Sequence, residues 1–237
     1  MRPLLVSFGG GNLAAITEVR SLEWATFSKW LTETPPEAAD KAARGWYCPA
    51  EFDPVYRDSQ NFVARHAITF DFDHVNIDTY GQVISAWDQL AFAIYTTFSH
   101  RADHPRFRVV MPLSRPAGYD EFQAVARRVA TDVGIELIAR ESFVPTQMMF
   151  APTRPLGGLH TSLVNEGTWL DVDEVLGEYK DWTDVSEWPR RKDGDPVHAG
   201  VEKTDPREKP GIIGAFNRAF TISQAIERFD LPYRRVR

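Results

Sequence analysis

Two aspartates one residue apart, Asp71 and Asp73, have the spacing in this sequence that most clearly suggests chemistry. They lie in the segment 66–75 (HAITFDFDHV), whose β-branched and aromatic residues predict a strand. Alternate side chains of a strand share a face, so both carboxylates should point one way while Phe70 and Phe72 point into the core. With Cα atoms about 7 Å apart, the carboxylates could share one divalent ion or hold a pair of ions. Mg²⁺ and Mn²⁺ favour such ligands; the alternative is a solvated acidic pair on an exposed strand face.

A histidine and two arginines follow the aspartates in the chain. His100 stands at the end of the apolar segment 91–99, a second predicted strand, where it could donate to a phosphate oxygen or move a proton. Its alternative is a histidine that is hydrogen-bonded in a strand-to-loop turn. Arg106 and Arg108 alternate with apolar residues at the predicted strand 107–113, so both guanidinium groups share a face and suit a phosphate. Two solvent-facing arginines on an edge strand would give the same pattern.

The elements that must position these residues are a mixture of strands and helices. Hydrophobic periodicity predicts strands at 3–8, 66–75, 91–99, 107–113, 135–138 and 147–152, and helices at 21–33, 79–90, 118–133 and 223–229. This mixture predicts an α+β (mixed α/β) fold. If the helix 79–90 crosses over between parallel, neighbouring strands, Asp73 and His100 lie at one edge of the sheet. Ser21 is expected to cap the first helix, and Pro116 to end the third strand.

Composition narrows the class of protein. The 237 residues include 43% hydrophobic and 25% charged residues, which is typical of a globular chain and not of a disordered one. The single cysteine, Cys48, excludes a disulfide framework, and no apolar run approaches the roughly 20 residues that span a bilayer. The net charge of −6 disfavours a protein that only coats nucleic acid. We therefore expect a soluble, cytoplasmic protein with no membrane partner.

Together the motifs resemble the catalytic core of the archaeo-eukaryotic primase superfamily, in the form found in phage and plasmid primase-polymerases. The matching residues are Asp71-x-Asp73, the pair Ser99-His100, and the runs PRFRVVMPLSRP (105–116) and FVPTQMMFAPT (143–153). The tryptophan-bearing segment 21–33, DKAAR (40–44) and Arg57 also look like this group. KPGIIGAFNRAFTISQAI (209–226) is similar to the stretch that links the primase core to a helicase in such proteins.

The resemblance implies template-directed nucleotidyl transfer, by a DNA primase or DNA polymerase of phage or plasmid replication in a bacterial cell. It also implies an RRM-like catalytic sheet packed with an N-terminal α/β half. Asp71 and Asp73 would bind Mg²⁺ or Mn²⁺, and His100, with Ser99, would hold phosphate oxygens of the incoming NTP or dNTP. The cations that would hold nucleotide phosphates or the template backbone are Arg106, Arg108, Arg115, Lys41, Arg44 and Arg57.

One position departs from the superfamily's pattern. The third motif supplies a further carboxylate to the metal site, and Ala139 and Arg140 stand in that region here. Glu136 or Glu141 would then replace it, and if neither reaches the metal, one ion would be held weakly. Two alternatives therefore stay open. A metal-dependent nuclease would also use an acidic pair with a histidine, and a catalytically inactive module that binds single-stranded or origin DNA would explain the weak third carboxylate.

The chain is expected to have three parts. They are a catalytic domain over 1–185, a Pro-, Lys- and Asp-rich linker over 186–210, and a C-terminal helical segment over 211–237 that could lead into a helicase domain of a longer protein. The expected partners are a single-stranded DNA template, NTPs or dNTPs, and a replicative helicase in cis or in trans.

Overall fold

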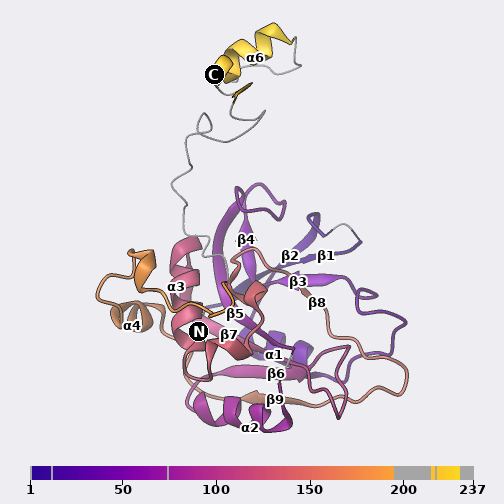
Figure 1. Ribbon diagram of the computed structural model, residues 1–237. Coiled ribbons are helices and arrows are strands. Elements are labelled where there is room, and N and C mark those ends of the chain that lie inside the picture. Colours follow the sequence, from indigo (N-terminus) through magenta and orange to yellow (C-terminus); the bar gives the residue numbers. More distant parts are fainter. Residues whose placement is uncertain (1, 12, 74, 195–214, 217, 230–237) are drawn as a thin grey trace. The chain divides into compact units, whose positions relative to one another are not determined.

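The computed structural model describes residues 2–11, 13–73, 75–194, 215–216 and 218–229 (Figure 1). The chain forms two compact units, Met1–Val197 and His198–Arg237. The boundary falls inside the expected linker 186–210, of which residues 195–210 lie outside the described residues. In the described part of the chain, no helix is long and apolar enough to cross a membrane.

Two antiparallel sheets form the first unit. The first sheet has the strand order β2-β1-β3-β8 and the second the order β4-β5-β7-β6-β9. The strands are β1 (Leu4–Gly9), β2 (Ile16–Leu22), β3 (Trp46–Cys48), β4 (Ala50–Phe52), β5 (Phe62–Phe72), β6 (Phe92–Thr96), β7 (Phe107–Ala117), β8 (Met149–Phe150) and β9 (Ser162–Asn165). The helices are α1 (Trp24–Thr32), α2 (Ile77–Ala86), α3 (Tyr119–Ala130) and α4 (Val172–Gly177), with short 3-10 turns η1 (Ile135–Leu137), η2 (Arg140–Phe143) and η3 (Val185–Glu187). The predicted α+β class is confirmed.

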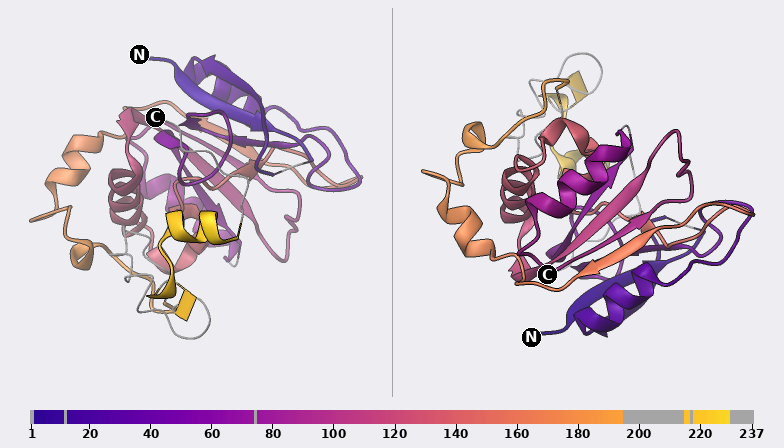
Figure 2. Two further views of the ribbon diagram at one scale, coloured as in Figure 1. Left: turned by 90° about the horizontal axis from the view of Figure 1, so that it is seen from above. Right: turned by 90° about the horizontal axis from the view of Figure 1, so that it is seen from below.

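The second sheet is buried on both faces. One face packs against α1 and the first sheet, in a core to which Phe27 of α1, Tyr47 of β3 and Val110 of β7 belong. The other face is covered by α2 and α3 (Figure 2). On that side the ring of Phe72 stacks on Phe107 with 4.6 Å between centroids. Burial on both faces fits the buried run from Ala64 to Phe70 along β5.

The second unit is described over residues 215–216 and 218–229. Its helix α6 (Ile222–Arg228) is capped by Thr221. A capping box joins Thr221 and Gln224, in which each side chain bonds the backbone N–H of the other residue. The rings of three phenylalanines contact one another at its base: Phe216, Phe220 and Phe229. The helix predicted at 223–229 is confirmed.

The strand neighbours in the second sheet differ from the sequence prediction. β6 does not lie beside β5, because β7 lies between them and runs antiparallel to both. Two reversals of direction leave β5 and β6 parallel to each other, so their C-terminal ends still reach the same edge. The unit β5-α2-β6-β7-α3 is therefore a split β-α-β arrangement, in which the crossover skips one strand position. It places Asp71, Arg108 and Tyr95 in one row across the sheet.

Two other predictions in this region are wrong for local reasons. The segment predicted as a strand at 135–138 is the 3-10 turn η1, which follows Gly134 in the left-handed region at φ 97°. Pro116 does not end β7, which continues to Ala117. The pairing of β5 with β7 shifts register between Arg65 and Ala67, and a proline is tolerated at such an irregularity because it cannot donate to a regular ladder.

The predicted cap of the first helix is also wrong. Ser21 belongs to β2, and α1 begins at Trp24 after Glu23, whose side chain makes no capping bond. The helix is instead held by its apolar side, which buries Trp24, Phe27 and Leu31 in a core that it shares with strands of both sheets.

His66 of β5 is buried between the two sheets at 4% exposure. Its Nδ1 accepts from the backbone N–H of Leu5 at 3.3 Å and lies 2.8 Å from Nη1 of Arg2. Burial, together with the charges of Arg2 and Arg65, lowers the pKa of His66 to about 4. The ring is therefore neutral in the folded protein at pH 7 and would lose the Arg2 contact on protonation.

This burial predicts a specific pH dependence of stability. As the pH falls below 6.5, His66 becomes protonated in the unfolded chain, whereas in the folded chain it becomes protonated only near pH 4. The free energy of unfolding therefore falls between these two pH values, by up to about 3 kcal/mol. Urea unfolding at about pH 7, 5 and 4 should show this loss. The side-chain oxygen of Gln in the variant His66→Gln can accept the same bonds but does not titrate. The variant should therefore lose up to about 3 kcal/mol less unfolding free energy than the wild type over this pH range. Equal losses in the two proteins would contradict the lowered pKa of His66.

Candidate active site

An open cleft of about 260 Å³ lies where β5 and β6 end and β7 begins. Its wall on the other side is the segment 147–153, which contains β8 of the first sheet. The charged residues that line it are Lys41, Asp71, Asp73, Arg106, Arg108 and Glu141. The cleft thus gathers the aspartates and both arginines that the sequence singled out.

Asp71 is held from two sides. Its carboxylate receives a bidentate bond from Arg108, with Nε donating to Oδ1 at 2.6 Å and Nη2 donating to Oδ2 at 3.0 Å. Its backbone N–H donates to Oγ of Ser142 at 3.0 Å, and its carbonyl accepts from Ala139 at 2.8 Å. These bonds fix the carboxylate of Asp71 in one orientation.

Arg108 joins Asp71 to the rest of the cleft. Its Nη1 donates to the hydroxyl of Tyr95 at 3.0 Å and to the carbonyl of Phe150 at 3.2 Å, and the hydroxyl of Tyr95 lies 2.8 Å from that of Tyr47. Burial opposes the charge of Arg108, but the carboxylate of Asp71 and the two tyrosines outweigh it and keep its pKa above the ordinary value. Burial raises the pKa of both tyrosines, so they remain hydroxyl donors. Neither tyrosine was singled out from the sequence, although Tyr95 lies in the predicted strand 91–99 that leads to Ser99 and His100.

Asp73 is the more accessible of the two aspartates. Its side chain is 41% exposed against 20% for Asp71, and its Oδ1 lies 3.6 Å from Nη1 of Arg106. As the sequence predicted, Phe70 and Phe72 are buried while both carboxylates reach the cleft. Asp73 is therefore free to bind a further group.

Ser99 and His100 have different surroundings. Ser99 lines the cleft, whereas His100 lines two other hollows, beside Pro105 and the loop 155–159. Nδ1 of His100 accepts from the backbone N–H of Arg106 at 3.1 Å. Partial burial lowers the pKa of His100, and a ring whose Nδ1 accepts a hydrogen bond is the neutral form. His100 thus holds the chain that carries Arg106.

The two glutamates expected to replace the third carboxylate are separated. Glu141 lines the cleft next to Ala139, and its side chain is more than half exposed. Glu136 does not line the cleft: its Oε1 accepts from the backbone N–H of Lys192 at 2.7 Å, and Arg191 lies 3.9 Å from its Oε2. Of the two, Glu141 is the carboxylate that shares the cleft with Asp71 and Asp73.

Three further cations border the cleft in different ways. Lys41 lines it, with Nζ 5.1 Å from the centroid of the Phe150 ring. Arg44 and Arg57 do not line it but donate at 2.9 Å to the carbonyls of Pro152 and Thr146, respectively. Arg44 therefore holds the wall 147–153 at Pro152, and Arg57 holds the residue just before that wall.

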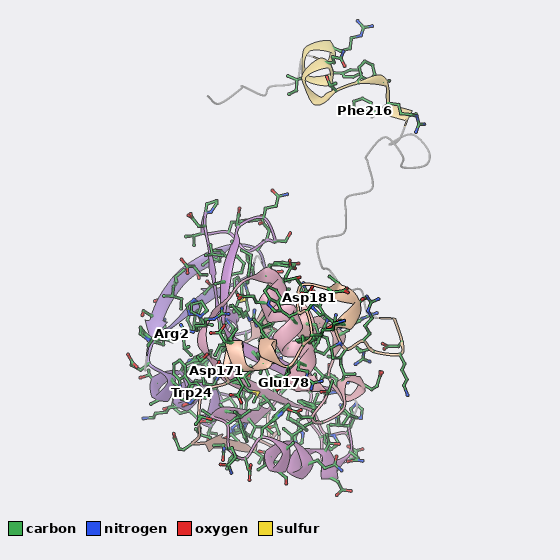
Figure 3. The ribbon with its side chains drawn as sticks, turned by 90° about the vertical axis from the view of Figure 1, so that its left-hand side faces the viewer. Arg2, Trp24, Asp171, Glu178, Asp181 and Phe216 are labelled. Atoms are coloured by element: carbon green, nitrogen blue, oxygen red, sulfur yellow. The ribbon has the colours of Figure 1, made fainter. Side chains whose placement is uncertain are left out.

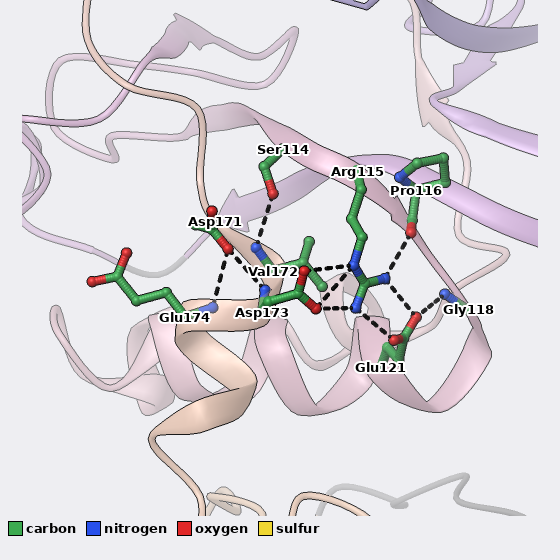
Figure 4. Close-up of polar contacts among 9 residues, drawn as sticks. All are labelled: Ser114, Arg115, Pro116, Gly118, Glu121, Asp171, Val172, Asp173 and Glu174. Carbon is green, nitrogen blue, oxygen red and sulfur yellow. Dashed lines mark hydrogen bonds and ion pairs between the residues drawn. The ribbon is translucent and has the colours of Figure 1, made fainter.

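Arg115 lies at the other end of β7. It binds Glu121 of α3 and Asp173 of α4, each by bonds as short as 2.7 Å (Figure 4). Asp171 precedes α4, and Glu178 and Asp181 follow it (Figure 3), so this acidic segment and Arg115 form a surface separate from the cleft. The structure does not bring Arg115 to the other predicted site residues.

The carboxylates of the cleft fit a divalent cation that is shared with a substrate. Each oxygen of Asp71 already accepts one bond from Arg108, but an ionised carboxylate has about four acceptor sites. Among the described residues, no three side chains of His, Cys, Asp or Glu form a group that could hold a metal ion by themselves. Mg²⁺ commonly keeps several waters and takes one or two carboxylates together with substrate phosphates. The donors present suit that mode of binding.

Comparison with known proteins gives a family. The family described as the VapE N-terminal domain matches residues 45–191, which include both aspartates and the strands that carry them. The chain belongs to the VapE N-terminal domain family. Among solved structures, the AEP (archaeo-eukaryotic primase) domain of the cyanophage S-2L primase-polymerase is similar to this family member, with 11% identity and a TM-score of 0.43, over 74% of this chain and 88% of that chain. A search of the curated proteins finds no match.

Removing Arg108 from this VapE N-terminal domain should lower the free energy of unfolding much more than removing Arg106. Arg108→Met leaves Asp71 without its partner and the hydroxyl of Tyr95 without its donor, so we expect a loss of about 3 kcal/mol in unfolding free energy. Arg106→Met, in which a half-exposed contact of 3.6 Å to Asp73 is lost, should cost less than about 1 kcal/mol. Urea denaturation of both variants measures the difference. Equal losses would show that Arg108 does not hold the cleft together.

Proposed function

We propose that the chain is a metal-dependent nucleotidyltransferase that adds NTPs or dNTPs to a strand on a DNA template, as a primase, a polymerase or both. The observation that carries this proposal is the cleft itself. It combines two carboxylates from one strand face with cations that suit phosphate, and it lies at the edge where β5 and β6 both end. The motif resemblance supports the same reaction class.

The residues would divide the work according to their surroundings. Asp71 and Asp73 would hold Mg²⁺ or Mn²⁺, which when bound neutralises the triphosphate and activates the attacking hydroxyl. Asp71 is oriented in advance by Arg108, so little reorganisation is needed when the substrate arrives. Asp73 is exposed enough to exchange its contact with Arg106 for the incoming group.

The groups that would bind phosphate are the cations Arg106 and Lys41 and the hydroxyl of Ser99. All three line the cleft, and a charge-assisted bond to a phosphate is stronger than a neutral one. Arg108 has a different role from the one that the resemblance implied, because its donors are used by Asp71, Tyr95 and Phe150. His100 would act through Arg106, whose backbone it binds. Glu141 is the candidate for the third carboxylate.

The aspartate variants test the proposal. Asp71→Asn and Asp73→Asn keep the shape of each side chain but remove the charge that a divalent cation requires. We expect each to lower incorporation of labelled nucleotide on a single-stranded template more than about 100-fold, the upper end of what loss of a supporting group costs a metal site. The assay is run with Mg²⁺ or Mn²⁺, and with and without a primer.

Glu136→Gln is the matched control, because Glu136 is a carboxylate of the same region that does not line the cleft. It should keep normal incorporation. Shortening of labelled DNA in the absence of nucleotides would favour a nuclease instead. Template binding without incorporation, indifferent to Asp71→Asn, would favour a catalytically inactive DNA-binding module.

The phosphate contacts predict a separate kinetic effect. Arg106→Ala removes a cation of the cleft and should raise the KM for nucleotide about tenfold, since one charge-assisted contact contributes about 1.5–3 kcal/mol. Arg115→Ala, which removes an arginine at the other end of β7, is the control and should leave KM within about twofold. An unchanged KM in Arg106→Ala would remove this residue from the proposed phosphate site.

A further inference from the structure

β2 is an open edge strand with both faces accessible. It pairs with β1 on one side, and no other described strand pairs with its outer side. Residues 17–21 are all exposed. The outer N–H and C=O groups of such a strand are a template for pairing with another chain.

The side chains of β2 are arranged symmetrically about Val19. Glu18 and Arg20 flank it, Thr17 and Ser21 follow, and Ile16 and Leu22 stand at the ends. Acid therefore mirrors base, hydroxyl mirrors hydroxyl, and apolar mirrors apolar. Val19 itself is 42% exposed, and the side chains of Glu18 and Arg20 are each about half exposed.

We propose that this edge binds the β2 edge of a second copy of the chain, antiparallel and centred on Val19. In that register Glu18 lies opposite the partner's Arg20, and Arg20 lies opposite the partner's Glu18. Val19 meets its own copy across a two-fold axis, which is the isologous arrangement expected of a symmetric dimer. The first sheets of the two copies would then join into one continuous sheet.

The charges select this register over the others. A parallel, in-register pair would place Glu18 against Glu18 and Arg20 against Arg20, which is destabilising. An antiparallel pair centred on Arg20 would also bring two arginines together. A register shift between Phe8 and Gly9 limits the regular part of β2 to Glu18–Leu22. The regular pairing about Val19 therefore spans only Glu18–Arg20 of each copy, and the association is weak.

Pairing would cost the free chain only an exposed ion pair of β2. Within one copy, Arg20 already binds Glu18 through two bonds of 2.8 and 2.7 Å on the exposed surface. An exposed pair of this kind contributes little to stability, so it can be exchanged for the two pairs between copies. β2 and β8 are opposite edges of the first sheet, and β8 is the strand that borders the cleft. The dimer would therefore leave the cleft open, and the inference does not depend on the proposed function.

Charge exchange along β2 tests the dimer in the full chain. Light scattering at concentrations up to about 1 mM, the weak end of measured affinities, should show the wild-type mass rising toward that of two copies. Glu18→Arg and Arg20→Glu each place like charges in register and should weaken association at least about tenfold. The double variant Glu18→Arg/Arg20→Glu restores the complementarity and should associate as the wild type does.

Mixing experiments make the test independent of any one variant's stability. The two single variants should bind each other, because one strand then carries two bases and the other two acids. The double variant should not pair with the wild type, since their strands oppose acid with acid and base with base. Energy transfer between labelled chains measures both mixtures. A wild type that stays monomeric, single variants that associate normally, or free mixing of the double variant with the wild type would each overturn the proposal.

Discussion

The guanidinium group of Arg108 binds both carboxylate oxygens of Asp71, the hydroxyl of Tyr95 and the carbonyl of Phe150, and the cleft depends on these bonds. A buried arginine is costly unless all of its donors are used, so the sequence must supply partners from β5, β6 and β8 at one level of the fold. Tyr47 of β3 extends the chain of bonds into the first sheet. Both sheets are thereby joined at the point where the proposed chemistry occurs, and Asp71 has one orientation while Asp73 keeps its freedom.

The central position of β7 follows from the same interaction. Only a strand between β5 and β6 can present Arg108 to an aspartate on one side and a tyrosine on the other. The antiparallel register that places these three residues in a row also brings the C-terminal ends of β5 and β6 to a common edge. Asp73 and Ser99, which follow the ends of β5 and β6, therefore both reach the cleft although they are far apart in sequence. The segment Ala139–Ser142 covers the remaining side of β5 and carries Glu141.

The sequence was sufficient for most elements, because periodicity and motif spacing are local properties. Of the residues that it singled out, some line the cleft (Asp71, Asp73, Ser99, Arg106, Arg108, Lys41 and Glu141) and others do not (His100, Arg44, Arg57, Arg115 and Glu136). The sequence was not sufficient for the strand order. Its hydrophobic pattern is the same whether β6 lies directly beside β5 or is separated from it by β7. Nor could it separate Arg106 from Arg108, which share a face but differ in depth, or show that Arg115 meets Glu121 and Asp173. Those outcomes depend on contacts between residues distant in sequence.

We propose above all that Asp71 and Asp73, with Asp71 oriented by Arg108, form a site for a divalent cation that comes with a nucleotide. Anomalous diffraction at the manganese edge, from crystals grown with Mn²⁺ and a non-hydrolysable nucleoside triphosphate, tests this site. We expect a manganese peak about 2.1 Å from carboxylate oxygens of both aspartates, the distance at which small divalent cations bind such oxygens. A bound triphosphate with its manganese coordinated elsewhere, and both aspartates free of it, would contradict the proposed site.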